Sequence, residues 1–161
     1  MTQITIEYMI MVPVLIMQIF IFPFAATMMM DTWVDSRREL VLQETAGHLG
    51  SSIQQLYYTI NRASISNGSL TLKLDTPPSI EGYAYTITLH NATNSNAQAR
   101  IMNITLNLVG ARGATSTLVT FGENAAWQDN ALYLSNSTSI NATKTSSGSI
   151  LLSLEGGAYS Q

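Results

Sequence analysis

A single carboxylate, Glu7, stands at the start of a long apolar run in this sequence. Residues 8–30, which follow it, contain no charged side chain. A helix of that length, at about 1.5 Å per residue, is long enough to span a bilayer. A lone carboxylate beside such a segment is costly without a partner. We therefore expect Glu7 to make a specific polar contact. The alternative is a place at the edge of the apolar region, in contact with water, where it caps the positive end of the helix dipole.

Other residue types that carry out chemistry are dispersed along the chain. His48 and His90 are single and far apart, and there is no cysteine, HExxH motif, Gly-rich phosphate loop or nucleophile elbow. Asp129 and Asn130 lack the spacing of an EF-hand calcium site. We therefore predict no catalytic, cofactor-binding or metal site, and we do not expect an enzyme.

Asparagines in N-x-S/T sequons form the remaining group of interest, because this pattern accepts N-linked glycans. The five sequons begin at Asn67, Asn91, Asn103, Asn136 and Asn141. All of them follow the apolar run, as a glycosylated exterior requires. The alternative is that Asn, Ser and Thr are simply the surface residues of β-strands. We expect Asn103 on the polar face of a strand and the other four in turns or loops.

One long helix is expected to carry the N-terminal residues. Beyond the apolar run, small and large apolar side chains recur at spacings of four and three, which indicates one helical stripe. The stripe consists of Leu42, Ala46, Leu49, Ile53, Leu56, Ile60 and Ala63. A helix from about residue 4 to about residue 63 would be roughly 90 Å long. A small domain cannot cover that length, so something outside the chain must cover the rest.

Breaks within and after this helix are also visible in the sequence. Pro13 and Pro23 interrupt the helical hydrogen bonds, and in lipid the freed carbonyls need other partners. Gly47 and Gly50 are expected to permit close approach of another helix. Asn67-Gly68 is a turn signal that ends the helical region.

Short alternating runs follow and predict β-strands, because apolar and polar residues exchange with a period of two. The runs cover residues 70–74, 83–89, 101–109, 116–121, 131–134 and 150–154. Residues 139–149 are mostly polar and are expected to form an exposed loop. We predict an α+β fold, in which a long N-terminal hydrophobic helix precedes an antiparallel β-sandwich-like head. The expected parts are residues 1–30, an amphipathic continuation at 31–63, and the head at 64–161.

Charge and composition restrict the partners of this chain. The net charge of the 161 residues is −3, and the cations of the head form no cluster, so we do not expect nucleic acid as a partner.

The apolar run is too long for a cleaved secretory signal peptide and lacks a basic region before it, although an ordinary signal anchor remains an alternative. Trp33 suits either a membrane interface or a packing position at the end of the run.

The start of the chain, Gln3-x-Thr5-x-Glu7, resembles the Gln-x-Ser-x-Glu start of archaeal type IV pilins with class III signal peptides. Thr5 replaces the usual Ser, and Thr2 stands where Gly is common. The resemblance covers about the first 30 residues. It implies cleavage before Gln3 by a prepilin peptidase, and a contact between Glu7 and the new N-terminus of a neighbouring subunit.

The resemblance also implies a function. We expect a structural subunit of an extracellular pilus for adhesion, a helical homo-oligomer assembled by the pilus machinery from chains that first sit in the cytoplasmic membrane. N-linked glycans would coat it. The alternatives are an archaellin-type motility filament subunit, or a membrane-anchored monomer whose β head binds a ligand.

Overall fold

The computed structural model describes residues 2–91, 99–127, 132–134 and 139–155, with the side chains of 2–7, 99 and 132–134 excepted. The chain divides into two compact units, Met1–Arg37 and Arg38–Gln161. Helix α1 (Thr2–Ile60) supplies the whole described part of the first unit and also the helical part of the second. The long N-terminal helix expected from the sequence is therefore confirmed.

In the first unit, α1 continues through both prolines, and its large apolar side chains are exposed. Phe22 is 78% exposed, Ile19 is 67% exposed and Leu15 is 52% exposed. A soluble helix normally keeps such side chains on a face covered by other elements. Nothing described in this unit covers them.

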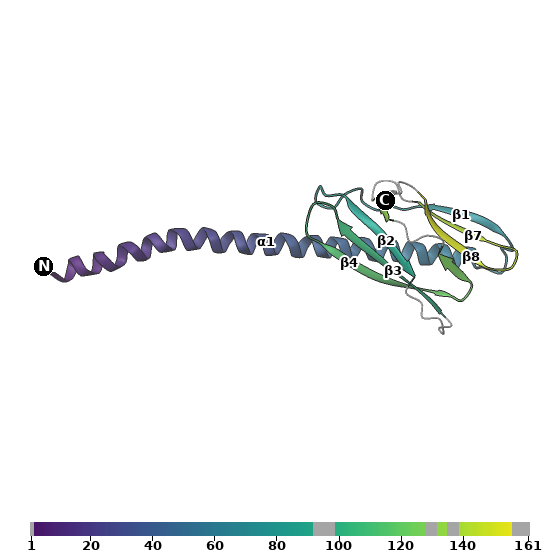
Figure 1. The fold of residues 1–161 in the computed structure, drawn as a ribbon, viewed down its shortest axis with the longest axis horizontal. Helices are drawn as coiled ribbons and strands as arrows, with labels where there is room; N and C mark the ends of the chain where they lie inside the picture. The colour runs from purple at the N-terminus through teal and green to yellow at the C-terminus, as the bar shows by residue number, and fades with distance from the viewer. Residues whose placement is uncertain (1, 92–98, 128–131, 135–138, 156–161) are drawn as a thin grey trace. The chain divides into compact units, whose positions relative to one another are not determined.

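Two four-stranded sheets make up the rest of the second unit (Figure 1). The first sheet has the order β1 (Gly68–Lys73), β7 (Ser139–Lys144), β8 (Ile150–Glu155), β5 (Ala125–Trp127). The second has the order β4 (Ala114–Gly122), β3 (Ala99–Leu108), β2 (Tyr85–Asn91), β6 (Leu132–Leu134). Neighbouring strands are antiparallel except β5 and β8, which are parallel. The predicted α+β fold with a sheet-built head is confirmed.

The expected exposed loop at 139–149 is wrong over its first half, because residues 139–144 form β7 in the interior of the first sheet. Ile140 and Ala142 are completely buried, while the residues between them face outward. With only two apolar side chains, one of them small, the strand resembles a polar loop in composition. Its pairing with both β1 and β8 supplies the missing stability.

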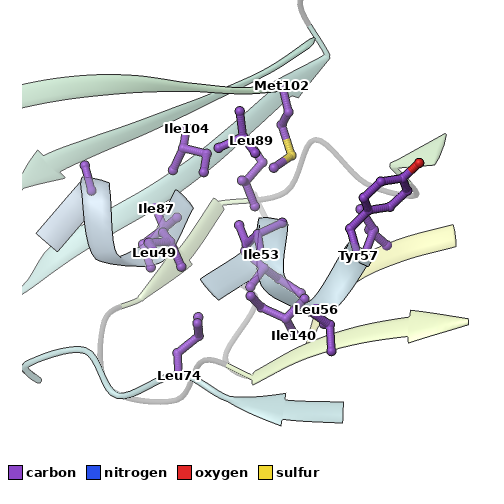
Figure 2. Packing of buried hydrophobic residues seen from close by; sticks show 14 of the residues in the cluster. Leu49, Ile53, Leu56, Tyr57, Leu74, Ile87, Leu89, Met102, Ile104 and Ile140 are labelled. Carbon is purple, nitrogen blue, oxygen red and sulfur yellow. The ribbon is translucent and has the colours of Figure 1, made fainter. Parts of the chain in front are cut away.

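The predicted helical stripe is the centre of the hydrophobic core. Its members up to Ile60 are buried among residues of both sheets. Figure 2 shows Leu49 and Ile53 of α1 beside Ile87 and Leu89, with Leu56 next to Ile140 of the other sheet. Ala63 is an exception, since the helix ends at Ile60 and Ala63 is exposed.

Gly50 brings the helix close to a sheet and not to another helix of the described chain. A Cβ atom at this position would lie 3.0 Å from Cγ2 of Val119 on β4. That distance is closer than ordinary van der Waals contact, so glycine is what permits the observed spacing. Gly47, by contrast, has no atom within 4 Å of its would-be Cβ.

The end of α1 is held by a hydrogen-bond network centred on the hydroxyl of Tyr57. This hydroxyl donates to Oδ1 of Asn124 at 2.7 Å and accepts from the backbone N–H of Gly122 at 3.0 Å. Nδ2 of Asn124 in turn donates to the Gly148 carbonyl and to Oδ1 of Asn61. The network joins the last helical turn to the β4–β5 and β7–β8 turns. It therefore fixes where both sheets meet the helix.

Candidate assembly and modification sites

The apolar surface of residues 8–30 is the first candidate site. By length and composition alone, α1 includes a segment that could cross a membrane. None of the most apolar 18-residue stretch of this helix is buried within the chain. An exposed apolar surface this long is outside the range normally tolerated by a free soluble monomer. It therefore needs lipid or protein around it.

Gln3 and Glu7 lie four residues apart in α1, which places them one above the other on the same side of the helix. Their side-chain contacts fall outside the described part of the chain. The expected partner of Glu7 therefore stays a prediction. What the helix does establish is that an α-amino group at Gln3 would lie about one turn from Glu7 along the helix axis.

Trp33 follows the apolar run and is 59% exposed. The guanidinium carbon of Arg37, one turn later, lies 5.8 Å from the centre of the Trp33 ring. This geometry suits a cation–π contact, which places an amphipathic ring and a positive charge at the end of the apolar segment. The pair fits a boundary between apolar and aqueous surroundings.

Two sequon asparagines lie at exposed ends of strands. Asn67 is exposed directly before β1, as expected for a turn. Asn91 is exposed as the last residue of β2, so it is not in a loop as predicted. Asn136 lies outside the described residues. Exposed side chains of this kind can accept a glycan without disturbing the core.

Asn103 and Asn141 are half-buried on strands. Asn103 lies on β3 between His90 of β2 and Leu118 of β4, on the outer face that the sequence predicted. Asn141 was expected in a loop, which is wrong, because it lies on β7 between Thr71 and Ser153. The register puts both asparagines on sheet faces turned away from the core.

The two amide groups differ in how they are held. Nδ2 of Asn141 donates a hydrogen bond of 2.9 Å to Oε1 of Glu155. Among the described residues, Oδ1 of Asn141 and Oδ1 of Asn103 are buried without a hydrogen-bond partner. A glycan on Nδ2 of Asn141 would have to preserve or displace the Glu155 contact. Asn67 and Asn91 are more exposed to solvent than these two asparagines.

The two histidines are not brought together. His48 is exposed on α1 and lines an open hollow with Glu44 and Asp75, whereas His90 lies at the end of β2. Within the described ranges, no group of three or more His, Asp or Glu side chains is placed to hold a metal ion. The hollow beside His48 is an open groove between the helix and the segment after β1.

A small cavity near Trp127 was not anticipated from the sequence. Its volume is about 20 Å³, room for about one water molecule, and its lining includes Met102, Phe121 and Trp127. The indole N–H of Trp127 has no hydrogen-bond partner in the part of the chain that the structure describes. The cavity is too small for an organic cofactor. Trp127 lies on the three-residue strand β5, which is too short to give a periodic signal.

Tyr85 is the titratable residue with the clearest electrostatic perturbation. Its side chain is completely buried, and its hydroxyl donates to the Pro77 carbonyl at 2.7 Å. Burial raises the pKa of Tyr85 above the ordinary value of 10.0, and a side-chain hydrogen bond with Thr76 acts in the opposite direction. The cause is that the buried phenolate would lose its hydration.

This environment predicts a loss of stability in alkali. The unfolded chain releases the Tyr85 proton near pH 10, while the folded chain retains it, so the free energy of unfolding falls as pH rises above about 10. In the Tyr85→Phe variant this part of the pH dependence should disappear, with a loss of about 1 kcal/mol at neutral pH from the missing hydrogen bond. Urea unfolding of both proteins at about pH 8 and about pH 11 measures the difference. An equal drop in the two proteins would contradict the assignment to Tyr85.

No protein-family model matches this chain, and comparisons with curated proteins and with solved structures also yield no match.

Proposed function

We propose that this chain is a pilin, the structural subunit of an extracellular archaeal type IV pilus for surface attachment. The observation that carries the proposal is the uncovered apolar surface of α1 over residues 8–30, joined in one chain to a folded β unit. The similarity of Gln3-x-Thr5-x-Glu7 to archaeal pilin starts supports the same function.

The physical argument is that identical copies can bury one another's helices. Complete burial of one Leu, Ile, Phe or Met side chain contributes about 1.5–3 kcal/mol. Exposed side chains of these types continue from Met9 to Met30, so a bundle of copies buries many of them at once. The β units then remain outside, in contact with water. Such a polymer forms once a prepilin peptidase has cleaved the chain and the assembly machinery has drawn the helix out of the membrane.

A membrane-anchored monomer is the second candidate, because the same apolar segment could simply remain in lipid. An archaellin-type motility filament is a further alternative within the pilin-like proteins, and the Glu in Gln-x-x-x-Glu favours a pilin. The two classes differ in what covers the helix: lipid in the monomer and other copies in the filament. None of these alternatives requires a catalytic site.

Mechanical shearing of cells that produce the protein distinguishes the filament from the anchor. We expect the chain to appear in the sheared supernatant as polymers that sediment without detergent. An anchored monomer would stay with the membrane pellet and become soluble only after detergent is added. Recovery of the chain solely in that second form would contradict the proposed function.

We predict N-linked glycans on this filament, first at Asn67 and Asn91, whose side chains are exposed. The intact mass of the purified subunit should exceed that of the polypeptide by at least one glycan. The double variant Asn67→Gln, Asn91→Gln should lose part of this excess, while Asn107→Gln, a half-buried asparagine outside any sequon, should keep all of it. A wild-type mass equal to that of the bare polypeptide would refute the modification.

A further inference from the structure

We propose that the carboxamide of Gln18 is a contact point between copies of this chain. It donates a hydrogen bond to a main-chain carbonyl that a proline leaves without its helical donor in the neighbouring helix. This inference rests on the proposed function in one respect: it takes the helices of residues 8–30 to pack against one another.

The donor is identified by the two polar side chains in this part of the helix. Between Met9 and Met30 these are Gln18 and Thr27. Thr27 is satisfied within its own helix, since its hydroxyl lies 3.1 Å from the Pro23 carbonyl and 2.9 Å from the Phe24 carbonyl. The Gln18 side chain is exposed and carries two N–H donors and one acceptor oxygen. Removal of water from this surface would therefore leave Gln18 as the polar group in need of a partner.

The acceptors are identified by Pro13 and Pro23, both of which lie inside α1. Proline has no backbone N–H, so the carbonyl four residues earlier receives no helical hydrogen bond. The two carbonyls concerned belong to Met9 and Ile19. Gln18, Ile19 and Pro23 line one shallow hollow on the helix surface, together with Leu15, Ile21, Phe22 and Ala25. Gln18, which carries the free donor, and Ile19, whose carbonyl lacks its helical donor, therefore border the same hollow.

Gln18 cannot reach either carbonyl of its own helix. Helical side chains lean toward the N-terminus, whereas the Ile19 carbonyl points toward the C-terminus. The Met9 carbonyl is nine residues away, about 13 Å along the axis, which exceeds the reach of a glutamine side chain. The acceptor must come from a second copy.

The position of Gln18 makes this contact important before assembly as well. Gln18 lies near the middle of residues 8–30, about 15 Å from the start of the run and about 18 Å from its end. In a bilayer its amide could not reach interfacial water, in contrast to a residue near the helix ends. Polar side chains in such segments form hydrogen bonds between neighbouring helices. Copies should therefore associate in the membrane through the same contact.

Association of full-length chains in phosphatidylcholine vesicles tests the donor. The sequence has no cysteine, so donor and acceptor dyes can be attached to Ser64→Cys, an exposed position in the second unit. Gln18→Met keeps the length of the side chain and removes the amide. It should weaken self-association, measured by energy transfer, by about five- to thirtyfold. The matched control Met17→Leu should associate as the parent does.

The proline variants test the acceptor. Pro23→Ala supplies a donor for the Ile19 carbonyl, and Pro13→Ala supplies one for the Met9 carbonyl. One of these two proline variants should weaken the self-association of the parent chain. The same variant should not weaken self-association further in a chain that already carries Gln18→Met. Parent-like association of Gln18→Met, or parent-like association of both proline variants, would overturn the inference. So would a parent chain that stays monomeric in vesicles.

The vesicle measurement does not require filaments, which separates this inference from the proposed function. A parent chain that associates through Gln18 but never gives sheared polymers would contradict the filament alone. A chain that forms filaments with or without Gln18, and associates equally in vesicles, would contradict the Gln18 contact alone.

Discussion

Replacement of Leu15 by Asp is expected to abolish filaments while the second unit stays folded. Leu15 lies within the uncharged segment and is half exposed on the free helix. In a bundle of helices the introduced carboxylate would be buried without a partner, at a cost of several kcal/mol for every subunit. Ile19→Asp should have the same effect. The number of filaments in electron micrographs of sheared material, compared between variant and wild type, measures the effect.

Two controls separate assembly from insertion and folding. Leu15→Met conserves volume and polarity and should give normal filaments. One Asp at the centre of a membrane segment costs about 2.5–3.5 kcal/mol on insertion scales, which the remaining apolar residues offset, so the Asp variants should still reach the membrane fraction. Their β signal in circular dichroism should match the wild type. Normal filaments from either Asp variant would rule out a core built from residues 8–30.

Glu7→Gln is expected to give the second large effect, a rise of about tenfold or more in the concentration of subunit needed for assembly. The substitution keeps the shape of the side chain and removes the charge. A charge-assisted hydrogen bond is worth about 1.5–3 kcal/mol. Because this contact would be lost at every subunit, the variant should form shorter and fewer filaments. Glu7→Asp retains the charge and serves as the control. Filament length and number in electron micrographs measure the effect.

Normal length and number of filaments from Glu7→Gln would show that the carboxylate has no essential role in assembly. N-terminal sequencing of the filament protein then adds the second half of the test. If the first residue is Gln3, an α-amino group lies four residues before Glu7, as the proposed pairing with a neighbouring subunit requires. A different first residue moves the amine and demands another partner.

Elements with a strong local period were predictable from the sequence. Alternation of apolar and polar residues located β2, β3 and β8, and a helical stripe located the buried face of α1 up to Ile60. Each of these patterns is set by residues close together in the sequence. Their buried apolar side chains all pack into the same hydrophobic core. Local periodicity and tertiary burial agree in such segments.

Features that depend on distant partners were not predictable. β7 is stabilised by β1 and β8, since its own sequence contains only two buried apolar residues. The hydrogen bond from Tyr57 to Asn124 joins residues 67 apart in sequence. The positions of Asn91 and Asn141 on strands and the Glu155 contact of Asn141 likewise follow from strand pairing and packing. Local patterns of residue types in the sequence do not indicate these contacts between distant residues.

A helical reconstruction of filaments sheared from producing cells, with the subunit identified by mass, tests the central claim most directly. The proposed function predicts a polymer of this chain alone, in which residues 8–30 of neighbouring copies pack against one another along the axis and the two β-sheets face outward. A filament built from another chain, or one in which residues 8–30 lie exposed on the outside, would contradict it.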